Sequence, residues 1–206
     1  MYVDLTMAVG PETPVYPGSP PPAVLQWNKI DVHGYYINVL FFPEHVATHV
    51  DSPAHFVPGA KTVDQIDVSR FSGRFVAVDF SRLSPRASVG LRQFEEALPR
   101  GVELGPGWVV LIRTGYDAYA GTDKWLEHLD LSPELAGHPA RVDAVGVDAP
   151  SPDHEPFEVH KILRGREALN GTLTKLAAVV NRTGQFIGPP MKAGGGGAPV
   201  RTVAVV

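Results

Sequence analysis

The sequence of 206 residues contains no cysteine. Disulfide bonds and thiolate ligands are therefore excluded, and any metal ion must be held by histidine and carboxylate side chains. Long apolar runs are also missing, because no stretch approaches the roughly 20 residues that a helix needs to cross a bilayer. The first residues lack the positive start and apolar stretch of a signal peptide. We therefore expect no membrane partner and a cytoplasmic location.

Charge of one sign is not in excess. The 18 Lys and Arg residues against 22 Asp and Glu residues give a formal net charge of -4. This balance offers no basic surface for a polyanion, and a nucleic-acid partner is not expected. Hydrophobic residues make up 44% of the chain, which is enough for a sizeable core. The length predicts a single domain over residues 1–206.

Strands outnumber helices in the predicted architecture. Short runs rich in Val, Ile and aromatic residues predict strands at 24–30, 35–42, 74–80, 108–114, 142–147, 177–181 and 200–206. Residues 76–80 and 109–112 are apolar enough for strands that are buried on both faces. Helices are predicted at 91–98, at 156–163 with a stop near Gly165, and at 117–129. The four glycines at 194–197 predict a tight loop that brings backbone close to another group.

Four side chains of the metal-ligating type occur between residues 45 and 55: His45, His49, Asp51 and His55. A helix would place 45 and 49 on one face but would turn 51 away. A straight strand would direct all four to one side, yet it would separate 45 from 51 by roughly 20 Å. The chain must therefore bend, and the expected picture is a strand end that turns into a loop. Ala47 is small enough to permit the bend, as is Thr48.

This donor set predicts a metal site. Neutral imidazole and carboxylate are the ligands for zinc or manganese when thiolate is absent. A catalytic ion keeps one coordination position open for water and lowers the pKa of that water. We therefore expect a metal ion in this cluster, with His55 beside it as a general base or acid.

The pattern H-x-x-x-H-x-D-x-P-x-H over residues 45–55 resembles the signature of the cyclase-like metal hydrolases, a family that includes bacterial kynurenine formamidase and isatin hydrolase. Segments 4–6, 15–18, 109–115, 146–153 with His160, and 194–204 resemble other parts of the same family. The resemblance implies an α/β fold of the strand-rich β/β/α swivelling-domain type. It also implies a divalent metal and hydrolysis of an amide or related acyl bond.

The resemblance assigns roles to single positions. His45, His49 and Asp51 match the family's metal ligands, and His55 matches its acid/base histidine. His160 matches a ligand of the second metal in the binuclear formamidases. Tyr16 stands where kynurenine formamidase has a tryptophan that contacts the substrate.

One departure from the family pattern bears on the number of ions. Kynurenine formamidases carry a bridging glutamate about a dozen residues beyond the position of His160, but residues 168–175 contain no carboxylate and Glu167 falls several residues early. With Asp51 as the sole anionic ligand, two divalent ions would leave a large uncompensated charge. The sequence therefore predicts one ion, zinc or manganese. His160 is then available to bind substrate or to relay a proton.

The sequence gives fewer indications of the substrate pocket than of the metal site. Tyr16 in place of tryptophan predicts a substrate other than formylkynurenine, and Phe42 is a candidate pocket wall because it leads into the metal segment. Arg201 could bind a substrate carboxylate, although an internal ion pair with an Asp is favoured. Asp148 and Asp153 flank a Pro-rich turn, where Asp is common for local reasons, and neither is assigned as a ligand.

The preferred function is hydrolysis of the C–N bond of a formamide or cyclic amide by a metal-activated water. Two alternatives stay open. One is a ring-forming or dehydrating cyclase that acts on a polyketide-like intermediate, and the other is a non-catalytic binding protein on the same scaffold. The expected partner is a small-molecule substrate. The resemblance further implies a homodimer or homotetramer in which the N-terminal region reaches a neighbour's site.

Overall fold

The computed structural model describes residues 1–138, 142–163 and 168–206. Within these ranges a nine-stranded mixed sheet has the order β1-β13-β11-β5-β7-β9-β10-β4-β12. The strands are β1 (Tyr2–Asp4), β4 (His49–Asp51), β5 (Ser72–Asp79), β7 (Trp108–Arg113), β9 (Ala144–Val147), β10 (Ala168–Gly171), β11 (Thr183–Ile187), β12 (Gly197–Pro199) and β13 (Val203–Val205). Strands β5, β7, β9 and β10 run parallel, and the other neighbours in the sheet pair antiparallel.

Short elements surround this sheet. The α-helices are α1 (Ile30–His33), α2 (Leu91–Ala97), α3 (Pro133–Ala136) and α4 (Glu158–Leu163). The 3-10 helices are η1 (Pro53–His55), η2 (Val63–Gln65), η3 (Val68–Phe71), η4 (Tyr116–Tyr119), η5 (Asp123–Glu127) and η6 (Leu176–Ala178). Strands β6 (Ser88–Val89) and β8 (Asp130–Leu131) form a small parallel pair. None of the helices in the described ranges has the length and apolar character of a membrane span.

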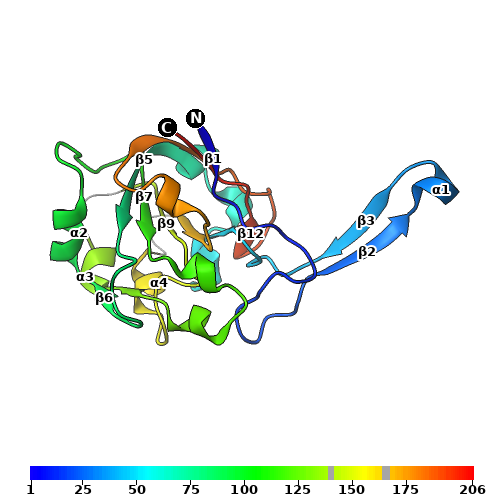
Figure 1. The fold of residues 1–206 in the computed structure, drawn as a ribbon, viewed down its shortest axis with the longest axis horizontal. Coiled ribbons are helices and arrows are strands. Elements are labelled where there is room, and N and C mark those ends of the chain that lie inside the picture. The colour runs from blue at the N-terminus through cyan, green and yellow to red at the C-terminus, as the bar shows by residue number, and fades with distance from the viewer. Residues whose placement is uncertain (139–141, 164–167) are drawn as a thin grey trace.

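A hairpin of β2 (Ala23–Asn28) and β3 (Ile37–Phe41) stands apart from the sheet. It carries α1 at its tip and extends away from the body of the molecule (Figure 1). Many of its apolar side chains are exposed, which distinguishes it from the sheet.

The central strands are buried on both faces, as their continuous apolar sequences predict. In β5, Val76 and Val78 join a core cluster that includes Phe94 of α2 and Val159 of α4. The alternate residues of β5 and β7 enter a second cluster, which contains side chains from η3, η6 and β11. Because successive strand residues point to opposite faces, one apolar run supplies both cores.

Most predicted strands are confirmed within a few residues, but two predictions are wrong. Residues 177–181 overlap η6 and a turn at Asn181, whose φ is 56°, and the strand follows at Thr183–Ile187. Residues 117–129 form the 3-10 helices η4 and η5 instead of one α-helix. The helices predicted at 91–98 and 156–163 are present as α2 and α4. The predicted stop at Gly165 lies outside the described residues.

Candidate metal centre

Strand β4 places His49 and Asp51 on the same face of the sheet, two residues apart. Both residues are buried, with exposed fractions of 7% and 8%. The strand lies between β10 and β12, so neither edge is open to solvent. At Gly171 of β10, a Cβ would lie 3.0 Å from Cε1 of His49. The absence of a side chain there gives the imidazole its space.

His45 reaches the same place because the chain bends at Ala47. Ala47 has a φ of 50°, so the bend predicted at this residue is confirmed. The order of the parts differs from the prediction, since the loop precedes strand β4 instead of following it. Gly197 of β12 makes room for the incoming ring, because a Cβ at that position would lie 2.5 Å from Cε1 of His45.

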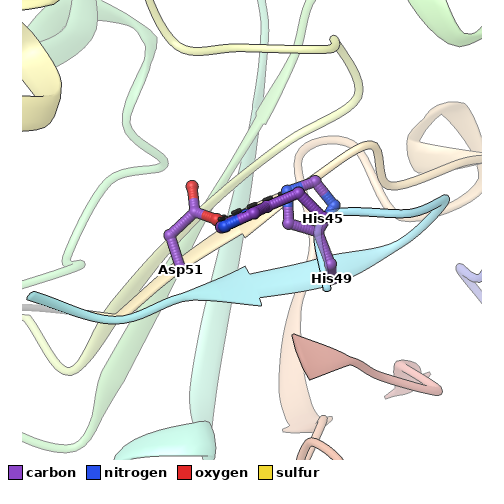
Figure 2. A group of neighbouring side chains, drawn as sticks. All are labelled: His45, His49 and Asp51. Carbon is purple, nitrogen blue, oxygen red and sulfur yellow. Dashed lines mark hydrogen bonds and ion pairs between the residues drawn. The ribbon is translucent and has the colours of Figure 1, made fainter. Parts of the chain in front are cut away.

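The three side chains converge (Figure 2). Oδ1 of Asp51 lies 2.6 Å from Nδ1 of His45 and 3.4 Å from Nε2 of His49. The two imidazole rings are perpendicular, at 88°, with centroids 5.1 Å apart. One ligand atom from each residue lies within 4.8 Å of the other two. This spacing and this donor set fit one small divalent cation.

The charges of the three side chains also suit the binding of a cation. Burial opposes ionisation of Asp51, but the charge of His49 and the hydrogen bonds from both histidines hold the pKa of this carboxyl well below its usual range. Asp51 is therefore an anion at neutral pH. Nδ1 of His49 donates a hydrogen bond of 2.8 Å to the carbonyl of Ala47, so Nε2 is the ring atom that faces Asp51 and that would bind an ion once its proton is lost.

His55 lies at the end of η1, directly beside the cluster. Its ring is stacked on that of His45, with centroids 3.9 Å apart. Partial burial lowers the pKa of His55 to about 4; the charge of Asp51 opposes this change, whereas His45 and His160 add to it. At neutral pH the ring is uncharged and can accept a proton.

His160 on α4 joins the cluster through a carboxylate that sequence reasoning did not assign. Nδ1 of His160 donates a hydrogen bond of 2.5 Å to Oδ1 of Asp153, whose Oδ2 accepts the backbone N–H of Val159 at 2.7 Å. Nε2 of His160 lies 3.8 Å from Oδ2 of Asp51. Asp153 therefore fixes the ring so that the lone pair of Nε2 faces the cluster.

These residues line a cavity of about 330 Å³. Among the described residues its walls are Pro14, Tyr16, Ser19, His45, Ala47, His49, Asp51, His55, Phe56, Trp125, Pro150, Ser151, Phe157, His160 and Thr172. The aromatic side chains come from four separate segments, and sequence reasoning found only Tyr16 among them. Phe42 is not among the lining residues that the structure describes, so its role as a pocket wall stays a prediction.

Two further sequence expectations find structural explanations. Arg201 donates to Asp4 at 2.8 Å, which confirms the ion pair, although the pair is exposed and not internal.

Asp148 accepts hydrogen bonds from the backbone N–H and the hydroxyl of Thr114 and from the N–H of Gly115, and it thereby joins the loops after β7 and β9. Burial raises the pKa of Asp148 to about 6.

A second group of metal-ligating type consists of His128, Asp130 and His154. The two imidazole rings are stacked, with centroids 4.0 Å apart and an interplanar angle of 6°. Because a ring nitrogen binds metal in the plane of its ring, two parallel stacked rings do not direct their lone pairs at one point. His154 instead bonds to Asp130 at 2.6 Å and to the carbonyl of Leu126 at 2.9 Å. We therefore assign this group a structural role.

The Cyclase family model, described as "Putative cyclase", matches residues 3–154. A kynurenine formamidase of Bacillus thuringiensis (strain Al Hakam) is 28% identical over 156 residues, which cover 74% of this chain and 70% of that protein. The fold is similar to that of an isatin hydrolase bound to the product analogue thioisatinate, with a TM-score of 0.91, 22% identity, and coverage of 100% of this chain and 92% of the other.

A structure titled "Potential Metal-Dependent Hydrolase With Cyclase Activity" has a TM-score of 0.81 and 20% identity, with coverage of 99% of this chain and 96% of the other. The expected strand-rich cyclase-like fold is confirmed by these structures. The family model contains the whole histidine and aspartate segment of residues 45–55 and covers well over half of the sequence. The chain belongs to the Cyclase family.

Proposed function

We propose that this chain is a metal-dependent hydrolase that cleaves the C–N bond of a formamide or a cyclic amide. The observation that carries the proposal is the convergence of His45, His49 and Asp51 in the wall of the cavity, beside an uncharged His55. A divalent ion held by the first three residues would polarise a carbonyl group and make water nucleophilic at neutral pH.

The remaining polar groups of the cavity are suited to proton transfer. His55 is neutral at pH 7, so it takes a proton from the attacking water and delivers it to the departing nitrogen. His160 keeps its Nδ1–H on Asp153 and presents Nε2 to the substrate. In this position it accepts a hydrogen bond from a substrate N–H or from water.

The walls of the cavity favour a planar, largely apolar substrate. Tyr16, Phe56, Trp125 and Phe157 supply aromatic surface around the polar cluster, and a volume of about 330 Å³ suits a small ring system. The names of the relatives, kynurenine formamidase and isatin hydrolase, support an aromatic compound with a formamide or cyclic amide group.

We propose a single ion, zinc or manganese, in this site. Within the described ranges, Asp51 is the one carboxylate among the three converging groups, and Nδ1 of His160 is engaged by Asp153. A second ion would therefore find no further carboxylate among these three converging groups.

The function is tested with purified protein loaded with Mn²⁺ or Zn²⁺, assayed on N-formylkynurenine, isatin and a simple aryl formamide. We expect turnover of at least one of these amides. His45→Ala should abolish ion binding, whereas His55→Ala should keep the ion and lower kcat by about 100-fold or more. An ion-loaded protein that hydrolyses none of the amides would overturn the proposed reaction and favour the ring-forming alternative.

We also propose that the chain forms a homodimer or homotetramer through the hairpin β2–β3. A two-stranded hairpin alone is marginally stable in water. Apolar side chains along it are nevertheless exposed: Leu25 by 60%, Trp27 by 71%, Leu40 by 56% and Phe41 by 60%. A second copy of the chain would cover these side chains. The cytoplasmic location and the single domain stay predictions.

A further inference from the structure

Glu44 lies next to the candidate metal centre but is not one of its ligands. Oε1 of Glu44 is 3.6 Å from Nε2 of His45. That nitrogen is buried and has no hydrogen-bond partner among the residues that the structure describes. The other nitrogen of the ring, Nδ1, lies 2.6 Å from Oδ1 of Asp51. The imidazole of His45 is therefore placed between two carboxylates, one at each nitrogen.

The glycine run gives the Glu44 carboxylate its place. A Cβ at Gly195 would lie 1.9 Å from Oε2 of Glu44, and a Cβ at Gly196 would lie 3.3 Å from Oε1. Any larger residue at Gly195 would displace the carboxylate. The loop is fixed to the metal segment, because the N–H of Ser52 donates to the carbonyl of Gly196 at 2.8 Å. The N–H of Val63 donates to the carbonyl of Gly195 at 3.1 Å.

A neutral imidazole has one N–H and one lone pair. If the lone pair binds a metal, the N–H on the other side needs an acceptor, and a carboxylate in that position fixes both the tautomer and the orientation of the ring. His49 already shows this arrangement, with its Nδ1–H on the carbonyl of Ala47. For His45 the corresponding acceptor is Glu44, and a small rotation of its flexible side chain closes the 3.6 Å separation to a hydrogen bond.

We propose that Glu44 is a positioning residue that accepts the Nε2–H of His45, so that the ion takes the place of the Nδ1 proton that bonds to Asp51 and Nδ1 becomes the metal-binding atom. This inference rests on the proposed function. It also addresses the charge of the site, because the charges of Asp51 and Glu44 together balance one divalent ion. Asp51 alone would leave a net positive charge.

The test measures the affinity of the purified full chain for Mn²⁺, Zn²⁺ and Co²⁺ by competition with a chelator. We expect Glu44→Ala to weaken binding by about ten- to 100-fold, as is typical for the loss of a partner of a metal-bound histidine. Glu44→Gln should lie between Glu44→Ala and the unchanged protein, because its amide oxygen still accepts the N–H. The visible absorption of bound Co²⁺ should change in Glu44→Ala, since the orientation of one ligand is altered.

A second variant disturbs the contact between Glu44 and His45 through a substitution in the glycine run. Gly195→Ala leaves Glu44 in the sequence but occupies the space of its carboxylate, so it should weaken ion binding in the same direction. Asp64→Asn is the matched control, because Asp64 lies by the same loop, 3.7 Å from a Cβ placed on Gly194, and its carboxylate accepts a hydrogen bond from the hydroxyl of Thr62. Thermal unfolding without metal checks that each variant is folded.

The outcomes separate this inference from the proposed function. If the unchanged protein binds an ion and Glu44→Ala binds it equally well, with the same Co²⁺ spectrum, the role of Glu44 is refuted and the metal site stands. If the unchanged protein binds no ion, both proposals fall.

Discussion

Ala47 holds the backbone in the left-handed region, with a φ of 50°, at the bend that brings His45 back to His49. This conformation costs a residue with a Cβ about 1 kcal/mol or more, and glycine adopts it freely. Ala47→Gly should therefore keep or raise the free energy of unfolding, by up to about 1 kcal/mol, even though glycine loses more entropy on folding. Ala47→Val should lower it by about 2 kcal/mol or more, because a β-branched residue is strained there.

Urea unfolding of both variants checks this prediction. Ala54→Gly is the control, since Ala54 in η1 has no positive φ and should lose stability on the same exchange. A loss of stability in Ala47→Gly equal to that in Ala54→Gly would show that the bend stores no strain.

Asp153 is a second residue at which one substitution gives a sharp test. Asp153→Asn preserves the size of the side chain and an acceptor for the N–H of Val159, but an amide can donate to Nδ1 of His160 and reverse the tautomer. We expect kcat to fall by about ten- to 100-fold, with the bound ion retained. Steady-state kinetics and metal analysis of the same sample measure the two effects. A parallel loss of ion would instead make His160 a ligand.

At the scale of elements, the hairpin β2–β3 makes the clearest prediction. Trp27 is 71% exposed and Leu40 is 56% exposed, and the hairpin has no third strand in the described part of the chain. If the proposed oligomer forms through this hairpin, Trp27→Lys combined with Leu40→Lys should convert it to a monomer, because two charges would be buried in the interface. Light scattering after size-exclusion chromatography measures the mass. Lys29→Ala, at the end of the hairpin, is the control and should leave the mass unchanged.

The elements also show where sequence patterns predict structure and where they do not. Strands β5 and β7 were predictable because burial on both faces requires a continuous apolar run. Strand β11 was not, since only Phe186 of its five residues is buried and the others are polar, small or exposed. The apolar run before it belongs to a turn instead, in which Leu176 and Val179 enter the core. A buried turn and a buried strand can have the same apolar composition, so composition alone does not distinguish them.

At the scale of the whole molecule, the residues of the site that lie close together in the sequence were predictable, and those that lie far apart were not. The three ligand candidates and His55 were predictable because they lie within one short segment, whose spacing forces a bend. The aromatic walls were not, since Trp125 and Phe157 come from segments that only the tertiary fold brings to the metal segment. Asp153 carried a weak signal, because a carboxylate in a Pro-rich turn is usually explained by the turn itself. Its pairing with His160 depends on the packing of α4 against the sheet.

The stability of the folded molecule should depend on pH through His128, which lies far from the proposed ligands in sequence and is 1% exposed. Burial lowers the pKa of His128 to about 4, against the opposing hydrogen bond to the carbonyl of Leu129, whereas the unfolded chain has the ordinary value of 6.5. The unfolded state therefore binds a proton first as the pH falls. The resulting stability is complete above pH 6.5 and is lost as the pH falls toward 4, by about 3 kcal/mol in total and about 2 kcal/mol at pH 5.

His128→Asn removes this titration but keeps a hydrogen-bond donor for the carbonyl of Leu129. The fall in unfolding free energy between pH 7.5 and pH 5 should thus be about 2 kcal/mol smaller in the variant, and urea unfolding at both pH values measures it. Equal falls in the two proteins would mean that His128 takes up its proton in the folded state as readily as in the unfolded chain.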